Sequence, residues 1–407
     1  MDKLLYPALI TLLGETMTEE LFRQDGYVSE FEAQVVEVKG DWVKLDGTAF
    51  YPGGGGQVCD TGQIGGIRVT EVKYEGKDIV HKAPGNTFSV GDRMWCGVDW
   101  ERRYDLMKGH TAEHILFNSL HRQDPDIEIV KIFISPESKY VVVDRDIGLD
   151  KIGDAIRFAN QVVADNHQVT KTVMSKDDPE IANIRIKLER IEEEEVTVVE
   201  IGDVDKAACS GVHVMETSEI GAIYVSRKVS AGKDGFAIHF EIGEQAKNDA
   251  MDLANKCQQI IDDLGSKTED IIKTVANMKH ELEEARKQLK AAVAASLRTL
   301  EPEKVNGTDV YSAVLMTSDK TPVADLCEKR KAEGAVCAFV CKGQTLMVMI
   351  ASGNKSVDCK KILADTMAEF GGRGGGKPDF AQGGIGDTDA ADKVLSSLRE
   401  RVKQALL

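Results

Sequence analysis

Two residue pairs with the same spacing carry the clearest chemical information in the sequence. HTAEH places His110 and His114 four residues apart, and CSGVH places Cys209 and His213 four apart, with Cys209 95 residues after His114. On a helix, residues four apart lie on one face, so the two imidazoles of HTAEH can reach one ion. With 8 His and 8 Cys in 407 residues, chance gives about 0.16 pairs of each kind and both together about once in forty. The four residues therefore predict one metal site.

One thiolate and three imidazoles are the donors that zinc prefers in tetrahedral sites. The long gap between the pairs excludes a zinc finger and indicates that two distant segments of one domain meet, as in an enzyme cleft. Four protein ligands fill a tetrahedral site, whereas catalytic zinc keeps one position for water or substrate. Three interpretations stay open: one ligand, such as His213, exchanges; zinc becomes five-coordinate; or the metal is structural.

A run of glycines stands in FYPGGGGQVCDTG, residues 50–62. Gly54, Gly55 and Gly56 let the backbone approach a ligand or adopt positive φ, although a wide hairpin loop would also use them. Gln57 follows directly, and its amide both donates and accepts hydrogen bonds. We expect Gln57 to contact a polar substrate if this loop borders the metal.

A second glycine-rich stretch, GGRGGGKPDFAQGG, spans residues 371–384. Its spacing matches neither the dinucleotide fingerprint nor the phosphate loop of nucleoside triphosphatases, so we expect chemistry that is independent of ATP. Backbone amides together with Arg373 and Lys377 could meet an RNA backbone. The alternative interpretation is a flexible loop.

The segments around these motifs predict an α+β protein. Alternating apolar residues in 31–50 indicate two strands joined near Lys39, and further strand-like runs at 64–73, 78–81 and 94–98 complete a small β-barrel. Apolar residues with helical spacing begin after Asp99 and occur again at 149–166. Strand-like runs alternate with these helices at 130–134, 141–144, 196–200 and 222–229. We predict a barrel domain over 1–98 and a zinc-binding α+β domain over 99–244.

The C-terminal half predicts two further parts. Residues 245–305 read as a helical hairpin with a turn at Gly265, in which apolar residues from Ile271 to Ala292 alternate steps of four and three. This coiled-coil-like seam either packs within the hairpin or joins two copies of the chain. Residues 306–407 predict a compact α/β domain with strands at 311–317, 335–342 and 345–352, a helix at 356–370 and a final helix to Leu407.

Composition limits the location and the partners of the protein. Eight cysteines without the density of a disulfide scaffold favour a reducing, cytoplasmic compartment, and we interpret most of them as small core residues. The first 20 residues make a poor signal peptide, and no apolar run is long enough to cross a membrane. A net charge of -17 argues against a broad nonspecific nucleic-acid surface. Any contact with RNA is therefore expected to be local.

Taken in order, the motifs resemble a known family. FYPGGGGQVCDTG, ERRYDLMKGHTAEHIL, VVEIGDVDKAACSGVHVMETSEIGAI, a helical hairpin and GGRGGGKPDFAQGG are similar to the editing half of alanyl-tRNA synthetase and to the long-form stand-alone AlaX editing proteins. The resemblance implies a zinc-dependent hydrolase that removes serine, and also glycine, from mischarged tRNA(Ala). It also implies a DHHA1-like C-terminal domain that holds tRNA and supports a homodimer, without the large aminoacylation domain.

The resemblance also assigns residues. His110, His114, Cys209 and His213 match the family's zinc ligands, Gln57 matches its glycine-loop glutamine, and Lys233 matches a basic position after the cysteine motif. CSGVH stands where the family has CGGTH, so Ser210 and Val212 replace a glycine and a threonine. Ser135 is the nearest candidate for the hydroxyl residue with which the family recognises serine.

Several roles and rival functions remain open at this level. Glu113 is adjacent to His114 and points about 100° away on a helix, so we expect it at the surface or at a helix cap rather than as a general base. Arg102, Arg103 and Lys108 would contact the acceptor stem or form a solvated helix face. The rival functions are a tRNA-binding protein with a structural zinc and a zinc hydrolase for a small ester or amide.

Overall fold

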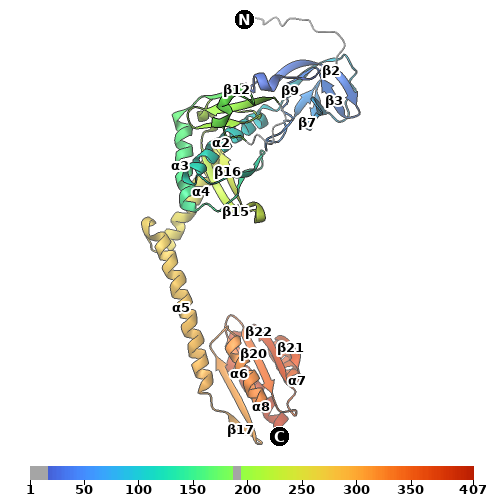
Figure 1. Cartoon of the computed structure of the whole chain (residues 1–407). Helices are drawn as coiled ribbons and strands as arrows, with labels where there is room; N and C mark the ends of the chain where they lie inside the picture. The colour runs from blue at the N-terminus through green and yellow to red at the C-terminus, as the bar shows by residue number, and fades with distance from the viewer. Residues whose placement is uncertain (1–16, 187–193) are drawn as a thin grey trace. The chain divides into compact units, whose positions relative to one another are not determined.

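The computed structural model describes residues 17–186 and 194–407. The chain divides into two compact units, one ending at Gln259 and the other spanning Ile260–Leu407 (Figure 1). Most of the N-terminal stretch that we weighed as a signal peptide lies outside the described residues. In the part of the chain that the structure describes, no helix combines the length and the apolar character needed to cross a bilayer. The finer division into four domains stays a prediction.

A seven-stranded, nearly closed sheet forms the predicted barrel at the start of the first unit. Its order is β6-β5-β9-β2-β3-β8-β7. The predicted turn near Lys39 is confirmed, because β2 and β3 pair antiparallel across Gly40, which has a φ of +61°. The strands are β2 (Glu30–Lys39), β3 (Trp42–Leu45), β5 (Gly62–Ile64), β6 (Ile67–Val69), β7 (Glu71–Glu75), β8 (Asp78–Lys82) and β9 (Arg93–Val98); the short β1 (Glu19–Glu20) pairs with β4 (Gly47–Thr48) beside α1 (Leu21–Gln24).

Helix α2 (Trp100–Gln123) follows the barrel and lies inside the rest of this unit. It contacts α3 (Leu149–Asp165) and a four-stranded sheet, and one hydrophobic core runs from the barrel strands through both helices. This sheet has the order β10-β11-β16-β15, and its strands are β10 (Ile129–Ile134), β11 (Lys139–Val143), β15 (Ile223–Ser230) and β16 (Phe236–Ile242). A three-stranded sheet consists of β12 (Val169–Ser175), β13 (Glu195–Ile201) and β14 (Asp205–Ala208).

Two helices occupy the segment predicted as a hairpin. Helix α4 (Gly243–Asp263) ends at the predicted turn, where Gly265 has a φ of +58° and the Ser266 amide donates to the Ile261 carbonyl. Helix α5 (Ile271–Arg298) follows. Most side chains of α5 are exposed until Val293 and Leu297, which enter the core of the second unit. The terminal part of α5 is therefore anchored, while its first turns present apolar residues to solvent.

The second unit is built on a six-stranded sheet with the order β17-β18-β19-β20-β22-β21. Along β19, alternate residues enter two different cores, because α6 covers one face of the sheet and α7 and α8 cover the other. The elements are β17 (Glu303–Val305), β18 (Thr308–Leu315), α6 (Thr321–Ala332), β19 (Val336–Lys342), β20 (Leu346–Ser352), α7 (Cys359–Phe370), β21 (Arg373–Lys377), β22 (Phe380–Ile385) and α8 (Ala391–Leu406). The predicted α/β architecture is confirmed.

The interpretation of GGRGGGKPDFAQGG as a flexible loop is wrong. β21 and β22 pair antiparallel, with Gly374 opposite Gly383 and Gly375 opposite Gln382. A Cβ on Gly374 would lie 2.5 Å from the Gly383 Cα, so a side chain on this residue would force the strands apart. The glycines therefore serve close strand packing rather than flexibility.

Candidate metal centre

Helix α2 places His110 and His114 in the interior of the first unit. Both imidazoles are buried, and their ring centroids lie 5.4 Å apart, one turn of the helix. The helix is buried over most of its length because the barrel, α3 and the sheets surround it. Its residues therefore face protein on several sides, and a histidine pair on it faces a water-poor space.

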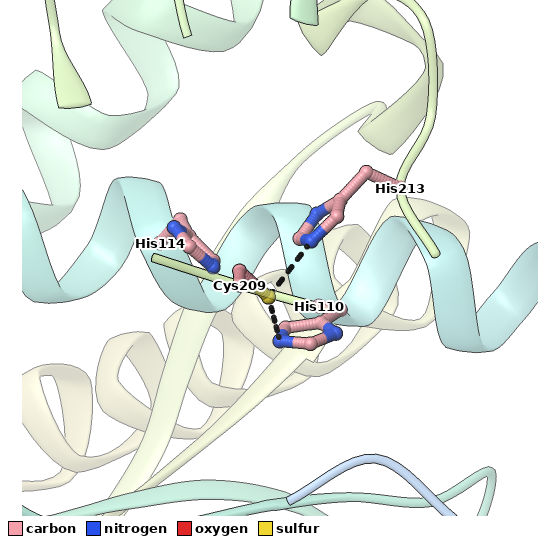
Figure 2. Close-up of side chains that lie close together, drawn as sticks. All are labelled: His110, His114, Cys209 and His213. Atoms are coloured by element: carbon pink, nitrogen blue, oxygen red, sulfur yellow. Dashed lines mark hydrogen bonds between the residues drawn. The ribbon is translucent and has the colours of Figure 1, made fainter. Parts of the chain in front are cut away.

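Cys209 and His213 follow β14 and meet the two histidines. The Cys209 amide donates to the Thr197 carbonyl at 2.9 Å, which fixes the start of the CSGVH segment on the neighbouring strand β13. The Cys209 Sγ lies 3.5 Å from His110 Nε2 and 3.2 Å from His213 Nε2 (Figure 2). One donor atom from each of the four residues lies within 4.8 Å of the others. The structure thus joins the two sequence pairs into a single cluster that could hold a metal ion.

The Nδ1 atom of each imidazole makes a hydrogen bond to a residue outside the cluster. His110 Nδ1 lies 2.8 Å from Gln57 Oε1, His114 Nδ1 lies 2.8 Å from Asp205 Oδ2, and His213 Nδ1 lies 3.2 Å from Thr111 Oγ1. The Thr111 hydroxyl already donates to the Met107 carbonyl, so its oxygen accepts from His213 Nδ1–H. With a proton on each Nδ1, the three Nε2 atoms remain to bind a metal.

The charges of the four side chains favour metal binding. Burial opposes charge on Cys209, but the neighbouring His110 and His213 hold the pKa of its thiol well below the usual value. Burial by itself would lower the pKa of His114, yet hydrogen bonds to Asp205 and Cys209 raise it to about 10. Burial lowers the pKa of His213 to about 3. A thiolate and an imidazolium therefore coexist, and a bound metal would displace the imidazolium proton.

Asp205 is the charged anchor behind His114. Burial opposes its ionisation, but the hydrogen bonds from His114 and Arg185 hold the pKa of its carboxyl at about 2. Arg185 Nη2 donates to the same Asp205 oxygen at 2.8 Å. The relay from Arg185 through Asp205 to His114 fixes both the orientation and the tautomer of the ring.

The glycine loop delivers Gln57 to the cluster. The Gly56 carbonyl accepts from the Ile134 amide at 2.8 Å, and the Val58 amide donates to the Ile134 carbonyl, so the loop is pinned to β10. Gly56 has a φ of +92°, and a Cβ there would lie 2.6 Å from the Ile132 carbonyl oxygen. Gln57 is 3% exposed and its Nε2 has no hydrogen-bond partner among the described residues. An unpaired amide donor therefore lies in the interior beside His110.

Comparison with known proteins places these features in a family. The chain matches the models for "tRNA synthetases class II (A)" at residues 16–102, "Threonyl and Alanyl tRNA synthetase second additional domain" at 196–235 and "DHHA1 domain" at 317–404. It is 26% identical to the alanyl-tRNA editing protein AlaX-L of Pyrococcus horikoshii, over 95% of this chain and 100% of that protein. The chain is an alanyl-tRNA synthetase editing-like protein.

Alanine–tRNA ligases match as well. The editing-like protein is 29% identical to the enzyme of Methanoregula boonei and 31% identical to that of Methanoculleus marisnigri, in both cases over 96% of this chain. The chain spans only 44% of the length of each of these ligases. The similarity therefore concerns one part of the ligases.

Two sequence-based expectations for α2 of the editing-like protein are wrong. Glu113 is 0% exposed rather than at the surface, neither of its carboxylate oxygens has a hydrogen-bond partner among the described residues, and burial raises its pKa. Arg103 is also 0% exposed and forms an ion pair with Asp60, so it is not free to contact an acceptor stem. Both errors have one cause: at these two positions α2 is surrounded by protein, so neither side chain reaches solvent.

The remaining predicted residues lie in several places. Arg102 donates to the Cys59 carbonyl and Lys108 lies over the Tyr104 ring, whereas Lys233 is exposed in the 3-10 turn Gly232–Asp234. No hydrogen bond or ion pair joins Lys233 to the cluster in the described ranges. The Ser135 hydroxyl is engaged with the backbone of Ser138. In CSGVH, Ser210 is exposed, and Val212 is buried in the core in place of a hydroxyl group.

Sequence analysis did not identify three residues that support the histidines of the cluster through hydrogen bonds. Asp205, Arg185 and Thr111 were not singled out, although Asp205 stands four residues before Cys209 and Thr111 stands inside HTAEH. Gly211 was also missed, and a Cβ there would lie 2.3 Å from the His110 ring. Only the position of Asp205 just before the cysteine motif could have suggested a supporting carboxylate.

Proposed function

We propose that this protein is a trans-editing deacylase that hydrolyses the ester of serine, and also glycine, wrongly attached to tRNA(Ala). The observation that carries the proposal is the cluster of three imidazole Nε2 atoms around the Cys209 Sγ, in which His110 and His114 are buried and Cys209 and His213 half-buried, beside the Gln57 amide nitrogen that has no partner among the described residues. Similarity to a protein named for alanyl-tRNA editing, over the whole of that protein, supplies the substrate class. As an editing enzyme of translation, the protein would work in the cytoplasm.

Zinc is the metal that we propose for the cluster. One thiolate with three neutral imidazoles is a donor set typical of zinc, and the Nδ1 hydrogen bonds direct the Nε2 atoms toward the centre, where a bound ion would replace the extra proton of His114. His110, His114, Cys209 and His213 would hold the ion. When bound, it supplies Lewis acidity and charge stabilisation to an ester at the site.

The chain's own groups would orient the ester and exclude bulk water. In the reaction, a water oxygen forms a bond to the ester carbonyl carbon, the bond from that carbon to the ribose oxygen breaks, and the ribose oxygen takes a proton. Free amino acid and uncharged tRNA result. We assign to Gln57 Nε2, which is buried and has no partner among the described residues, a hydrogen bond to a substrate oxygen, and to Gly54 and Gly55, which are exposed, a contact of their backbone with the ribose.

The same amide offers a basis for selecting serine over alanine. Alanine is smaller than serine, so steric exclusion cannot reject it. A buried donor that pairs with the serine hydroxyl can favour serine, since alanine would leave that donor unsatisfied. Glycine also lacks a hydroxyl, so this pairing predicts faster deacylation of serine than of glycine. We therefore assign substrate recognition to Gln57 as well as support of His110.

The decisive experiment compares deacylation of Ser-tRNA(Ala), Gly-tRNA(Ala) and Ala-tRNA(Ala) with zinc content measured in parallel. We expect rapid loss of serine, retention of alanine, and loss of both zinc and activity in Cys209→Ala. Cys257→Ala, which removes an exposed thiol on α4, is the matched control and should keep both. Failure of the zinc-loaded protein to deacylate any of the three would contradict the proposal.

A tRNA-binding protein with a structural zinc is the second candidate. The complete set of four protein ligands favours it, because such a set closes a tetrahedral site. This candidate predicts that the zinc-loaded protein binds tRNA(Ala) but turns over none of its acylated forms. The deacylation assay therefore separates the two functions.

We also propose that β21 contributes to tRNA binding. Arg373 and Lys377 stand at the two ends of this exposed edge strand, separated by three glycines without side chains. Two cations across a flat strand suit a phosphate backbone. Replacing both by glutamine should weaken tRNA binding and lower the salt dependence of the binding constant by about one per lost phosphate contact. An unchanged salt slope would exclude β21 as a contact.

A further inference from the structure

His213 stands on a loop, whereas His110 and His114 stand on helix α2 (Figure 2). The segment from Cys209 to Met215 forms neither helix nor strand. The His213 side chain is half-buried, and the other two histidines are buried. Helix geometry therefore places two of the imidazoles, and the place of the third depends on the contacts that hold its loop.

The carboxylate of Glu219 holds the loop immediately after His213. Its Oε1 accepts from the Met215 amide at 3.0 Å and from the Glu216 amide at 2.9 Å. The Met215 carbonyl accepts from the Val169 amide at 2.8 Å, so both backbone polar groups of Met215 are engaged. Glu219 therefore fixes the backbone two residues beyond the ligand.

Two tyrosine hydroxyls fix the same carboxylate. Tyr27 and Tyr104 each donate to Glu219 Oε2 at 2.7 Å. The Tyr27 hydroxyl also accepts from the Met215 amide at 3.0 Å. Burial and the hydrogen bond to Glu219 raise the pKa of Tyr104 to about 12, so its hydroxyl keeps the proton that it donates. Because Tyr104 belongs to α2, the carboxylate connects the loop to the helix that carries the other two histidines.

A helix cap explains only part of this arrangement. Glu216 and Glu219 form a capping box at the 3-10 turn Thr217–Ile220, and that motif needs the Glu219 carboxylate to accept only from the Glu216 amide. The bonds from the Met215 amide and from the two tyrosine hydroxyls lie outside the motif. They bind the carboxylate to the loop of His213 and to α2, so the cap alone does not account for them.

We propose that Glu219 is a positioning residue for the metal centre: through Met215 and the two tyrosines it sets the place of His213 relative to the histidines of α2. The inference rests on the proposed function for the identity of the metal and of the reaction. Groups that hold a ligand in place before the ion arrives raise metal affinity. Loosening this loop frees one ligand of four, so metal affinity should fall while the fold is retained.

The first test measures the zinc affinity of the full chain by competition with a chromophoric chelator. Glu219→Ala should lower the affinity by about tenfold, as removal of an outer partner of a ligand does. Glu219→Gln keeps an acceptor for the backbone amides and should recover most of this loss. Tyr27→Phe removes one hydroxyl and should lower the affinity by about fivefold. The matched control Tyr74→Phe removes a hydroxyl that pairs with Glu20, away from the loop, and should bind zinc like the wild type.

A double-mutant cycle shows whether Glu219 acts through His213. In a His213→Ala background, Glu219→Ala should cause no further loss of zinc affinity, because the ligand that it positions is absent. An equal loss in both backgrounds would overturn the proposal, since Glu219 would then act on the whole unit. Wild-type affinity in Glu219→Ala would overturn it as well. Should Glu219→Ala not fold, Tyr27→Phe in the same two backgrounds gives the same decision.

Zinc affinity is measured without RNA, so its outcome is separate from that of the proposed function. A wild type that binds zinc but deacylates no tRNA would contradict the proposed function, and the affinity comparison would still decide the role of Glu219. Unchanged affinity in the variants of an active wild type would overturn only the positioning role. A wild type that binds no zinc would overturn this inference together with the proposed metal.

Discussion

The residues that hydrogen-bond the three histidines decide how the cluster is arranged. Gln57, Asp205 and Thr111 each hold one imidazole by its Nδ1 atom, so all three rings present Nε2 to the Cys209 sulfur. Such partners fix ring orientation and tautomer before a metal arrives. Metal affinity should therefore depend on residues that never touch the ion.

Asp205 provides the test of this dependence. Asp205→Ala should lower zinc affinity by roughly 10- to 100-fold, because His114 loses both its orientation and its charged acceptor. The measurement is competition with a chromophoric chelator. Asp203→Ala, which removes a carboxylate whose side chain is 94% exposed, should bind zinc like the wild type. Equal affinities in the two variants would show that the support of His114 by Asp205 is irrelevant to the metal.

His81 makes stability depend on pH at a site remote from the cluster. It is 0% exposed, its Nδ1 donates to the Val43 carbonyl, and burial lowers its pKa from 6.5 to about 4. Between pH 6.5 and about 4, His81 is protonated in the unfolded chain but not in the folded chain. The free energy of unfolding therefore falls as the pH drops through this window. The loss approaches about 3 kcal/mol near pH 4. Urea unfolding at pH 7 and 4.5 should show a smaller pH effect in His81→Gln; an equal effect would contradict the assignment.

Helix α2 connects the barrel to the cluster through buried polar contacts. Arg103 Nε donates to Asp60 at 3.1 Å and its Nη1 donates to the Gly26 carbonyl at 2.8 Å. Asp60 also accepts from the Tyr51 amide, at the start of the glycine loop. The ion pair therefore ties α2, the barrel and the loop that carries Gln57 into one structure.

Breaking this ion pair should destabilise the first unit. Arg103→Met leaves the Asp60 carboxylate buried without a counterion, at a cost of about 3–5 kcal/mol. Arg102→Met, which removes only hydrogen bonds to the Cys59 carbonyl, should cost about 1 kcal/mol. Urea unfolding compares the two variants. Similar losses would mean that the Arg103–Asp60 pair has no special part in stability.

The molecule as a whole consists of two units, and in the second unit taken by itself α5 carries an exposed apolar stripe among the described residues. The stripe comprises Val275, Met278, Leu282 and Leu289, each at least 42% exposed. Its steps of three, four and seven residues are those of a two-stranded coiled coil. Of the two interpretations that the sequence left open, we therefore propose the one in which two copies of the chain associate through α5.

Light scattering after size-exclusion chromatography tests this association. We expect the wild type to be a dimer and Leu282→Glu to be a monomer, because a charge in the seam would lose its hydration on association. Lys279→Glu changes charge beside the stripe and should leave the dimer intact. A monomeric wild type at micromolar concentration would exclude association through α5.

The sequence alone determined the ligand types, the strand alternation and the approximate element boundaries, because these depend on spacing along the chain and on side-chain chemistry. HTAEH and CSGVH specify two donor pairs, and β19 reads as a strand from its apolar run. Only the tertiary structure decided that the two pairs meet, that Asp205 and Thr111 support them, and that Arg103 and Glu113 are buried. Those outcomes depend on what packs around α2, and local spacing along the chain does not specify that environment. GGRGGGK likewise became strand β21 because β22 offers it close backbone pairing, a contact formed only when the two segments lie side by side.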